Sequence, residues 1–196
     1  MKTTILKEEG FELACRGMAY SYFDPGVQDP HDWWVNHKSK AMARARKLAD
    51  KDGGHNKFLE SITVWIDITA SRAFWQEMDT YRVGITKQST STMHTLSKRR
   101  PVQEDFEAYT LPQTVMTFQE IWDNHRDDIM VLKENLPEGF LQTRLLVTNY
   151  KTLRNIVLQR EKHRYLHWRT FCDALREQLE HPELIWNNHD QANTGS

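Results

Sequence analysis

The segment Ser61–Thr69, SITVWIDIT, constrains the fold more than any other stretch of the sequence. Every second residue in it is apolar and β-branched: Ile62, Val64, Ile66 and Ile68. Successive side chains of an extended strand point to opposite faces, so this alternation predicts a strand with one buried face. The chain has 196 residues, which is enough for one domain with a core behind such a strand.

The remaining pattern mixes helices with two further strands. Thr3–Lys7 and Gln142–Thr148 are expected as strands. Helices are expected over residues 11–21, 30–51, 71–82, 117–134, 149–161 and 162–180, and Asp29 before Pro30 is typical of a helix start. Because no internal repeat or linker divides the chain, we predict a single α+β domain over residues 1–186, followed by a disordered polar tail at 187–196.

Composition argues against disorder and against a strong overall electrostatic field. Hydrophobic residues make up 39% of the chain and include seven Trp, while the mean hydropathy of −0.72 indicates a very polar surface. The net charge is −1, so no global field draws the protein to nucleic acid or to a membrane. Any anion site must therefore be built locally.

The sequence shows no targeting or disulfide pattern. Neither the start, MKTTILKEEG, nor any later stretch has an apolar run of the length of a signal peptide or a transmembrane span. Cys15 and Cys172 form no CxxC pair, so we expect neither a disulfide framework nor a structural zinc site. We therefore expect a cytoplasmic protein that has no membrane partner.

One segment contains no carboxylate, because the next acid after Asp79 is Glu104. Between them lie many Ser and Thr residues and five cations: Arg82, Lys87, Lys98, Arg99 and Arg100. Cations without nearby carboxylates are free to bind phosphate, and the hydroxyl groups supply further donors. The segment is either an anion site or a flexible polar loop, in which hydroxyl side chains compete for backbone hydrogen bonds.

Arg160 is a second candidate for an anion-binding residue. It shares one helix face with Asn149, Leu153 and Ile156. An arginine in line with buried residues must pair, reach solvent or hold the anion of a ligand. Its place near a helix C-terminus gives a purely structural alternative, because a cation there interacts favourably with the helix dipole.

Two other patterns have simpler explanations. His163 and His167 are four residues apart, but no third ligand is apparent, so we expect no metal. Lys38–Lys47 lies in a basic helix, which is more often a solvated surface than a reader of nucleic acid. A nucleic-acid-binding module is therefore the weakest of the functional alternatives.

Several segments together resemble the flavin-dependent thymidylate synthases. In that family a His is followed five residues later by Glu, then by a strand and a short helix; here His55 and Glu60 precede ITVWIDITASRAFWQEMDTYR, which runs without a gap to Arg82. The family also has a helical Asn five residues before an Arg, followed by His and Trp. This pattern matches Asn155, Arg160, His163 and Trp168, with Asn149 upstream, and the opening ELACRGMAY is similar to the family's Ala-Ala-Arg.

The resemblance covers most of residues 10 to 175 and implies a fold and an activity. The implied fold is α+β, with a small antiparallel or mixed sheet flanked by helices, in a homotetramer whose active sites form where subunits meet. The implied enzyme holds FAD without a Rossmann motif and methylates dUMP at C5 to give dTMP. Its carbon comes from methylenetetrahydrofolate and its reducing power from NADPH through the flavin, so the cofactor carries the chemistry.

The resemblance also implies roles for individual residues. Arg160 is the expected catalytic residue, which would hold the nucleotide next to the flavin ring. The expected FAD contacts are His55, Arg82, Asn149, Asn155 and His163. The expected nucleotide contacts, besides Arg160, are Glu77, Lys87, Ser89 and Thr90.

The sequence departs from the family in the acid-free segment. The family signature Arg-His-Arg falls on Thr80, Tyr81 and Arg82, and the later Arg of the signature falls on Thr92. These changes leave room for another substrate such as dCMP, for a hydroxymethyl product, or for a nucleotide-binding protein that has lost catalysis.

Overall fold

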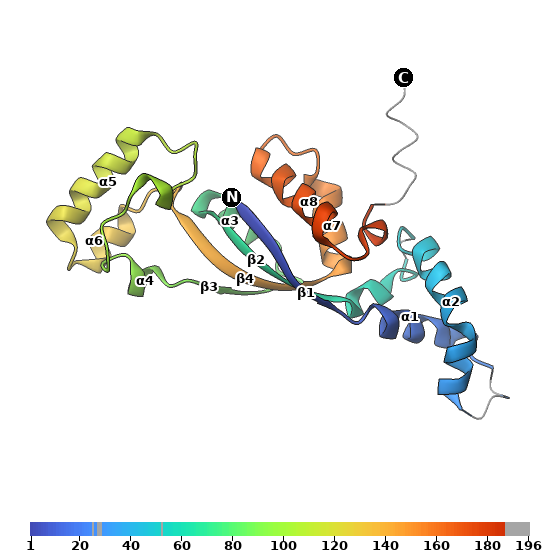
Figure 1. Ribbon diagram of the computed structural model, residues 1–196. Coiled ribbons are helices and arrows are strands. Elements are labelled where there is room, and N and C mark those ends of the chain that lie inside the picture. The colour runs from blue at the N-terminus through green and yellow to red at the C-terminus, as the bar shows by residue number, and fades with distance from the viewer. Residues whose placement is uncertain (25, 27–28, 52, 187–196) are drawn as a thin grey trace, which may run out of the picture. The chain divides into compact units, whose positions relative to one another are not determined.

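The computed structural model describes residues 1–24, 26, 29–51 and 53–186 and shows a mixed α and β fold (Figure 1). The α+β class that we expected is confirmed. The disordered tail that we expected at residues 187–196 lies outside the described residues. Within the described residues, no helix has both the length and the apolar character required to cross a membrane.

Four strands form one sheet in the order β1-β2-β4-β3. Their bounds are Lys2–Glu9 for β1, Thr63–Ser71 for β2, Thr86–Ser89 for β3 and Leu141–Asn149 for β4. The amide of Tyr150 donates to the carbonyl of Ile62 over 3.1 Å, whereas the hydroxyls of Thr69 and Thr143 are 2.7 Å apart. Because one residue number rises as the other falls, β2 and β4 are antiparallel.

The central strand β2 has the buried face that the sequence predicts. Val64, Ile66 and Ile68 are fully buried, and Ile62 is 1% exposed. The residues between them are partly exposed, as expected for a strand with one face in the core. The strand runs two residues further than the predicted segment and ends at Ser71, whose hydroxyl accepts a hydrogen bond from the amide of Phe74 and so caps the next helix.

Eight α-helices and four short 3₁₀ turns are assigned in the described residues. The helices are α1 Phe11–Ala19, α2 Pro30–Leu48, α3 Arg72–Met78, α4 Thr92–Thr95, α5 Pro112–His125, α6 Ile129–Glu134, α7 Tyr150–Arg160 and α8 Leu166–Gln178. The turns are η1 Tyr20–Tyr22, η2 Lys57–Ser61, η3 Gln103–Asp105 and η4 Pro182–Leu184. The predicted start of α2 is confirmed, because the Asp29 carboxylate accepts from the amide of His31 and Pro30 occupies the first turn.

Three predictions of local structure were wrong. The acid-free segment is not one loop: it forms the edge strand β3 and the helical turn α4, because pairing with β4 overrides the competition from its hydroxyl groups. The helix predicted over 117–134 is two helices, because Asp128 accepts from the amides of Met130 and Val131 and begins α6. The helix predicted from residue 162 begins at Leu166, after a turn.

Backbone contacts divide the chain into two compact units. Unit 1 contains Met1–Thr4, Ile66–Arg82 and Thr86–Leu146, and unit 2 contains Ile5–Trp65, Val83–Ile85 and the chain from Val147 onward. Strands β1, β2 and β4 each contribute residues to both units. The single domain expected over residues 1–186 stays a prediction.

Each unit has its own buried residues. In unit 1, α4, α5 and α6 lie together (Figure 1) over a cluster of Leu96, Phe106, Val115, Phe118, Leu132 and Leu136. In unit 2, α7 contacts α8 and α1 contacts α2. The sequence has apolar residues at three- and four-residue spacing, which predicts a buried stripe on the last helix: Tyr165, Trp168, Cys172, Leu175 and Leu179. The prediction is confirmed for the last four of these residues, which are buried, whereas Tyr165 is partly exposed.

Candidate functional site

The passage from β4 into α7 fixes the side chain of Asn149. Its Oδ1 accepts a hydrogen bond from the amide of Thr152 over 2.9 Å, so Asn149 is the N-cap of α7. Gly84 approaches closely: a Cβ there would lie 2.5 Å from Thr152 Oγ1 and 3.0 Å from Asn149 Nδ2. Asn149 is therefore held between its own helix and the backbone around Gly84, which is also anchored by a hydrogen bond from Thr148 Oγ1 to the Gly84 carbonyl.

Helix α7 separates a buried face from an exposed one. Leu153 and Ile156 are fully buried, as their spacing predicted. Asn155 is exposed and its Oδ1 accepts from Gln159 Nε2 over 3.0 Å. The helix therefore carries Asn149 at its start, Asn155 on its outer surface and Arg160 as its last residue.

Arg160 belongs to a cluster with His163 and Trp168, which we name the Arg160 cluster. The guanidinium carbon lies 4.7 Å from the centre of the Trp168 ring, and Trp168 is fully buried. Arg160 Nη1 donates to His163 Nε2 over 3.0 Å. Stacking on a desolvated indole is a strong form of cation–π contact, so the arginine is held in a defined orientation.

The second nitrogen of His163 also faces a donor. The amide of Tyr165 lies 3.2 Å from His163 Nδ1. A neutral imidazole accepts at only one ring nitrogen, so the Tyr165 amide and Arg160 require opposite tautomers of His163 and cannot both donate to it at once.

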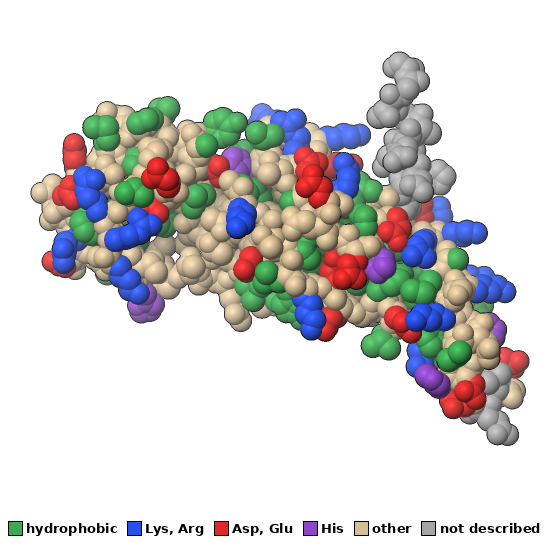
Figure 2. All heavy atoms as spheres, in the orientation of Figure 1, with side chains coloured by type: hydrophobic (Ala, Val, Ile, Leu, Met, Phe, Trp, Pro, Cys, Tyr) green, Lys and Arg blue, Asp and Glu red, His purple; other side chains and the backbone are tan. Residues whose placement is uncertain are grey.

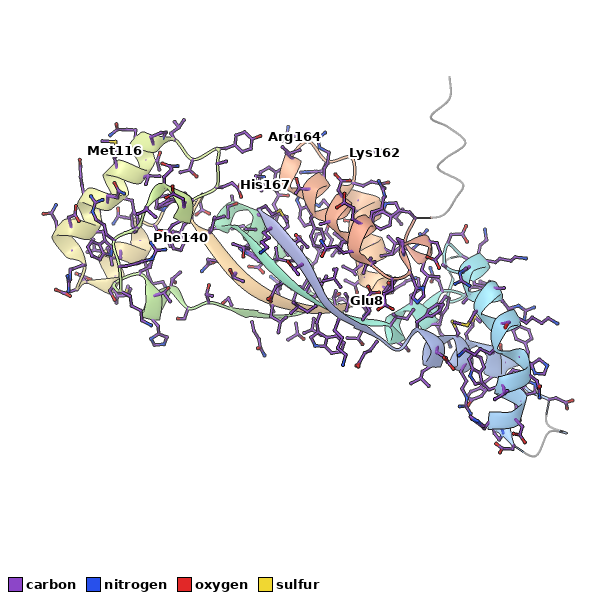
Figure 3. The ribbon with its side chains drawn as sticks, viewed as in Figure 1. Glu8, Met116, Phe140, Lys162, Arg164 and His167 are labelled. Carbon is purple, nitrogen blue, oxygen red and sulfur yellow. The ribbon has the colours of Figure 1, made fainter. Side chains whose placement is uncertain are left out.

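His163 and His167 do not share a helix. Figure 3 labels Lys162 and Arg164 on the turn between α7 and α8, and His167 on α8 itself. His163 belongs to this turn, whereas His167 is buried with its ring 4.7 Å from that of Tyr165. Among residues 1–24, 26, 29–51 and 53–186, no group of three or more His, Cys, Asp or Glu side chains is arranged to hold a metal ion.

His55 and Glu60 line a groove of about 510 Å³ between α1 and η2, which we name the His55 groove. This volume lies in the range of roughly 300–1,000 Å³ that small-molecule sites usually have. Asn56, next to His55 in the chain, anchors this stretch of backbone, because its buried side chain donates to the Ala49 carbonyl over 3.1 Å and accepts from Lys151. His55 itself is exposed, so a ligand in the groove can reach it.

In unit 1, the structure corrects the interpretation that Lys87 lies away from carboxylates. Lys87 Nζ donates to Asp79 Oδ1 over 2.7 Å and to the Met78 carbonyl over 3.2 Å. Arg144 Nη1 lies 3.1 Å from both carboxylate oxygens of Asp79. Asp79, which precedes the segment, therefore pairs with Lys87 within it. The expected nucleotide role of Lys87 stays a prediction.

Arg144 was missed by the sequence analysis. Its guanidinium lies 4.4 Å from the centre of the Trp75 ring, and Trp75 Nε1 donates to the Gln142 carbonyl over 3.0 Å. No local motif marks Arg144, because its partners come from another strand and helix. We name Asp79, Lys87, Arg144 and Trp75 the Asp79 cluster.

The pKa of Asp79 reflects this environment. Partial burial raises the pKa of the Asp79 carboxyl, but the hydrogen bonds from Lys87 and Arg144 outweigh burial. The net pKa therefore lies below its ordinary value, and Asp79 is ionised at neutral pH.

Two further cations of the acid-free segment are also paired. Arg99 Nη1 donates to Asp105 Oδ2 over 2.7 Å, and Arg100 makes two contacts of 2.8 Å with Asp123. The segment contains no acid of its own, but carboxylates from outside it pair with several of its cations. On the face shown in Figure 2, acidic and basic side chains are interspersed, with no separate basic region.

The other expected nucleotide contacts lie on several elements of unit 1. Glu77 is partly buried in α3, and Ser89 is exposed at the end of β3. Arg82, an expected FAD contact, is exposed after α3. The amide of Thr90 donates to the Thr143 carbonyl over 3.0 Å, and both residues line a cavity of about 260 Å³. The expected residues therefore lie in the Arg160 cluster, in the His55 groove and in or near the Asp79 cluster in sequence, except Asn149 and Asn155, which lie at the start and on the exposed face of α7.

Comparison with known proteins gives a structural match without a sequence match. No protein-family profile matches the chain, and no curated protein matches its sequence. Two crystal structures of the flavin-dependent thymidylate synthase X from Helicobacter pylori, each with FAD and dUMP, are similar to it. The TM-scores are 0.72 and 0.75 at 16% identity, and the matches cover 94% of this chain and 97% and 98% of those chains.

This likeness over nearly the full length shows that the chain has the fold of the flavin-dependent thymidylate synthases. The fold implied by the sequence resemblance is therefore confirmed, including the small sheet with helices around it.

Proposed function

We propose that this protein is a divergent flavin-dependent enzyme that binds FAD and a pyrimidine deoxynucleoside monophosphate and modifies the base at C5. The observation that carries the proposal is the full-length match in fold to a protein solved with FAD and dUMP. The expected substrate is dUMP and the expected product is dTMP, with methylenetetrahydrofolate and NADPH as co-substrates. The expected assembly is a cytoplasmic homotetramer.

The residues of unit 2 fit such a ligand set. The His55 groove has the volume of a site for part of a flavin nucleotide, and its largely apolar lining includes the polar side chains of His55, Lys57 and Glu60. Asn149 and Asn155, on the helix that ends at Arg160, are further proposed flavin contacts of unit 2, with His163. Arg82, in unit 1, is the remaining proposed flavin contact. When bound, the flavin supplies the hydride transfer that the reaction needs.

Arg160 is the proposed catalytic residue. Its stacking on Trp168 and its hydrogen bond to His163 hold the guanidinium in one orientation before any ligand arrives. A planar guanidinium so held can donate to an oxygen of the pyrimidine or of the phosphate with little loss of side-chain freedom. Around the nucleotide, the proposed contacts are Glu77, Lys87, Ser89 and Thr90.

The test begins with the visible absorption spectrum of the purified protein during titration with FAD. Addition of dUMP or dCMP should then shift the flavin bands for one of the two nucleotides. Release of tritium from the C5 position of that nucleotide, with methylenetetrahydrofolate and NADPH present, would measure turnover. A spectrum of free flavin throughout, from folded protein, would contradict the proposal.

The departures from the family signature at Thr80, Tyr81 and Thr92 support a second candidate, a nucleotide-binding protein on the same fold without catalysis. Asp79 already occupies Lys87 and Arg144, so a ligand phosphate would have to compete with a carboxylate of the chain itself. Nucleotide binding without tritium release or NADPH oxidation would favour this candidate. Reproducible turnover with either dUMP or dCMP would exclude it.

A further inference from the structure

A separate cavity of unit 2 lies between α1, η1 and α2 and has a volume of about 250 Å³. Aromatic and basic side chains dominate its lining: Tyr22, Trp33, His37, Lys40 and Arg44. Met18, Ala19 and Ala41 complete it, and no carboxylate is among the lining residues that the structure describes. The cavity contains none of the residues expected to bind flavin or deoxynucleotide.

The aromatic wall of this cavity is ordered by its own contacts. The rings of Trp33 and His37 are stacked, with centroids 4.6 Å apart and planes at 14°. His37 Nδ1 donates to the Trp33 carbonyl over 2.7 Å, which fixes the imidazole and leaves Nε2 for another partner. Phe23 packs edge-on against Trp33 with ring centroids 5.4 Å apart.

The two cations of the cavity differ from their neighbours on α2. Lys38 pairs with Glu12, and Arg46 donates to Glu183 over 3.0 Å. Within the described part of the chain, neither Lys40 nor Arg44 forms an ion pair with a carboxylate. Arg44 instead lies over the Tyr22 ring at 3.9 Å from its centre.

The positions of Lys40 and Arg44 suit a single anion. They are four residues apart on α2, so their side chains leave the same face of the helix. Like charges at this spacing destabilise a helix slightly, and a bound anion removes that cost. The contact with Tyr22 holds one of the two cations at the cavity, and the aromatic wall lies beside them.

We propose that this cavity binds a small aromatic phosphate, of the mononucleotide class. The base packs against the aromatic side chains, and the phosphate accepts hydrogen bonds from Lys40 and Arg44. The volume is below the usual range of roughly 300–1,000 Å³ for drug-sized ligands, which excludes a dinucleotide such as FAD from this cavity. The inference goes beyond the proposed function and does not depend on it.

Met18 and Tyr22 line both this cavity and the His55 groove. A ligand that fixes the Arg44–Tyr22 pair therefore also fixes part of the wall of that groove. The two sites can be tested separately, because Lys40 and Arg44 line only the smaller cavity.

The experiment is isothermal titration calorimetry of the full chain, at low salt and with FAD present, using 5′-AMP and 5′-GMP as probes. Adenosine, which lacks the phosphate, and inorganic phosphate, which lacks the base, are the comparison ligands. The test variant combines Lys40→Gln with Arg44→Gln. Lys47→Gln is the matched control, because it removes one exposed cation of α2 that does not line the cavity.

We expect at least one of the two mononucleotides to bind, and both comparison ligands to bind at least tenfold more weakly. The double variant should lose roughly tenfold in affinity per cation removed, whereas Lys47→Gln should retain wild-type affinity. Binding that persists in the folded double variant, or no binding of either mononucleotide to the wild type, would overturn the proposal. A flavin titration run in parallel tests the proposed function by itself, so the two can fail separately.

Discussion

Two clusters in this protein use the same device, an arginine stacked on a buried tryptophan, with different partners. In unit 1, Arg144 lies 4.4 Å from the centre of the Trp75 ring and its guanidinium contacts the Asp79 carboxylate. In unit 2, Arg160 lies 4.7 Å from the centre of the Trp168 ring and contacts the imidazole of His163. The indole fixes the arginine in both; Asp79 adds a formal negative charge to the first contact, and His163 adds an imidazole to the second. Stacking therefore sets orientation, and the second partner sets the local charge.

The largest expected effects test whether Trp75 and Trp168 contribute equally to the stability of the protein. Trp75 and Trp168 are buried to within 1% of full burial, so Trp75→Ala and Trp168→Ala should each lower the free energy of unfolding by about 3–5 kcal/mol. Urea unfolding followed by circular dichroism measures this change. Trp186→Ala is the control. Arg176 lies 4.7 Å from the centre of the Trp186 ring, the same distance as for Arg160 and Trp168, but the Trp186 indole is only partly buried. An equal loss in that control would show that the arginine contact, rather than burial, carries the stability.

The next effect concerns the proposed role of Arg160. Arg160→Ala should weaken binding of the deoxynucleotide that shifts the flavin bands by roughly 10–100-fold, because charge-assisted hydrogen bonds are lost. Titration of that nucleotide into the FAD complex measures the change. Arg169→Ala, at an exposed position of α8, should leave the affinity unaltered. Unchanged affinity in Arg160→Ala would remove Arg160 from the nucleotide site.

Asp79→Asn should remove the negative charge of the first cluster. Lys87 and Arg144 would then face a neutral amide, and we expect affinity for inorganic phosphate to rise by roughly tenfold, about 1.4 kcal/mol. Calorimetry with phosphate measures this without reference to flavin.

Asp127→Asn is the matched control for that experiment, because Asp127 is 93% exposed and its nearest cation, Arg126, lies 3.6 Å away. The depressed pKa of Asp79 adds a second readout. Its stabilising contribution is complete above the unfolded pKa of 3.8 and disappears as pH falls through the lower folded value. A phosphate affinity that does not respond to Asp79→Asn would show that the carboxylate does not compete for these cations.

The smallest expected effect concerns Glu8 of unit 2, a carboxyl group whose pKa is raised, whereas that of Asp79 is lowered. Burial raises the pKa of Glu8 above its ordinary value of 4.5, although its hydrogen bonds with Tyr150 and the Glu180 amide lower it. The folded protein therefore holds this proton more tightly, and the stabilisation is complete below pH 4.5 and declines as pH rises through the raised value. The melting temperature of Glu8→Gln should lack this decline, which is small because the carboxyl is only half-buried and solvent screens it. A decline of the same size in the variant would assign it to other groups.

The sequence predicted those features whose cause is local. Alternation fixed the buried face of β2, and three- and four-residue spacing identified the buried stripe of α8 around Trp168. The Asp29–Pro30 pair located the start of α2. In each case the residues that determine the outcome are neighbours in the chain, so that their pattern can be read directly.

Predictions from the sequence were wrong or missing where a residue's contacts are made by residues that are distant in the chain. The absence of acids between Asp79 and Glu104 suggested unpaired cations, but Lys87, Arg99 and Arg100 find carboxylates at Asp79, Asp105 and Asp123 in the folded chain. Arg144 carried no signal at all, because its role depends on the register of β4. His163 was placed in a helix, whereas its hydrogen bonds to Arg160 and Tyr165 belong to a turn.

Gly84 has a consequence for how this chain can change its sequence. Its backbone has a φ of +70°, and a Cβ at this position would lie 2.5 Å from a side chain of α7. Any other amino acid would have to displace Thr152 and disturb the cap at Asn149. In a library with all twenty amino acids at position 84, selection for folded protein should return glycine. The preceding residue, Val83, is 88% exposed and should tolerate most substitutions. Two adjacent positions would therefore differ as widely as possible in the number of amino acids that they accept.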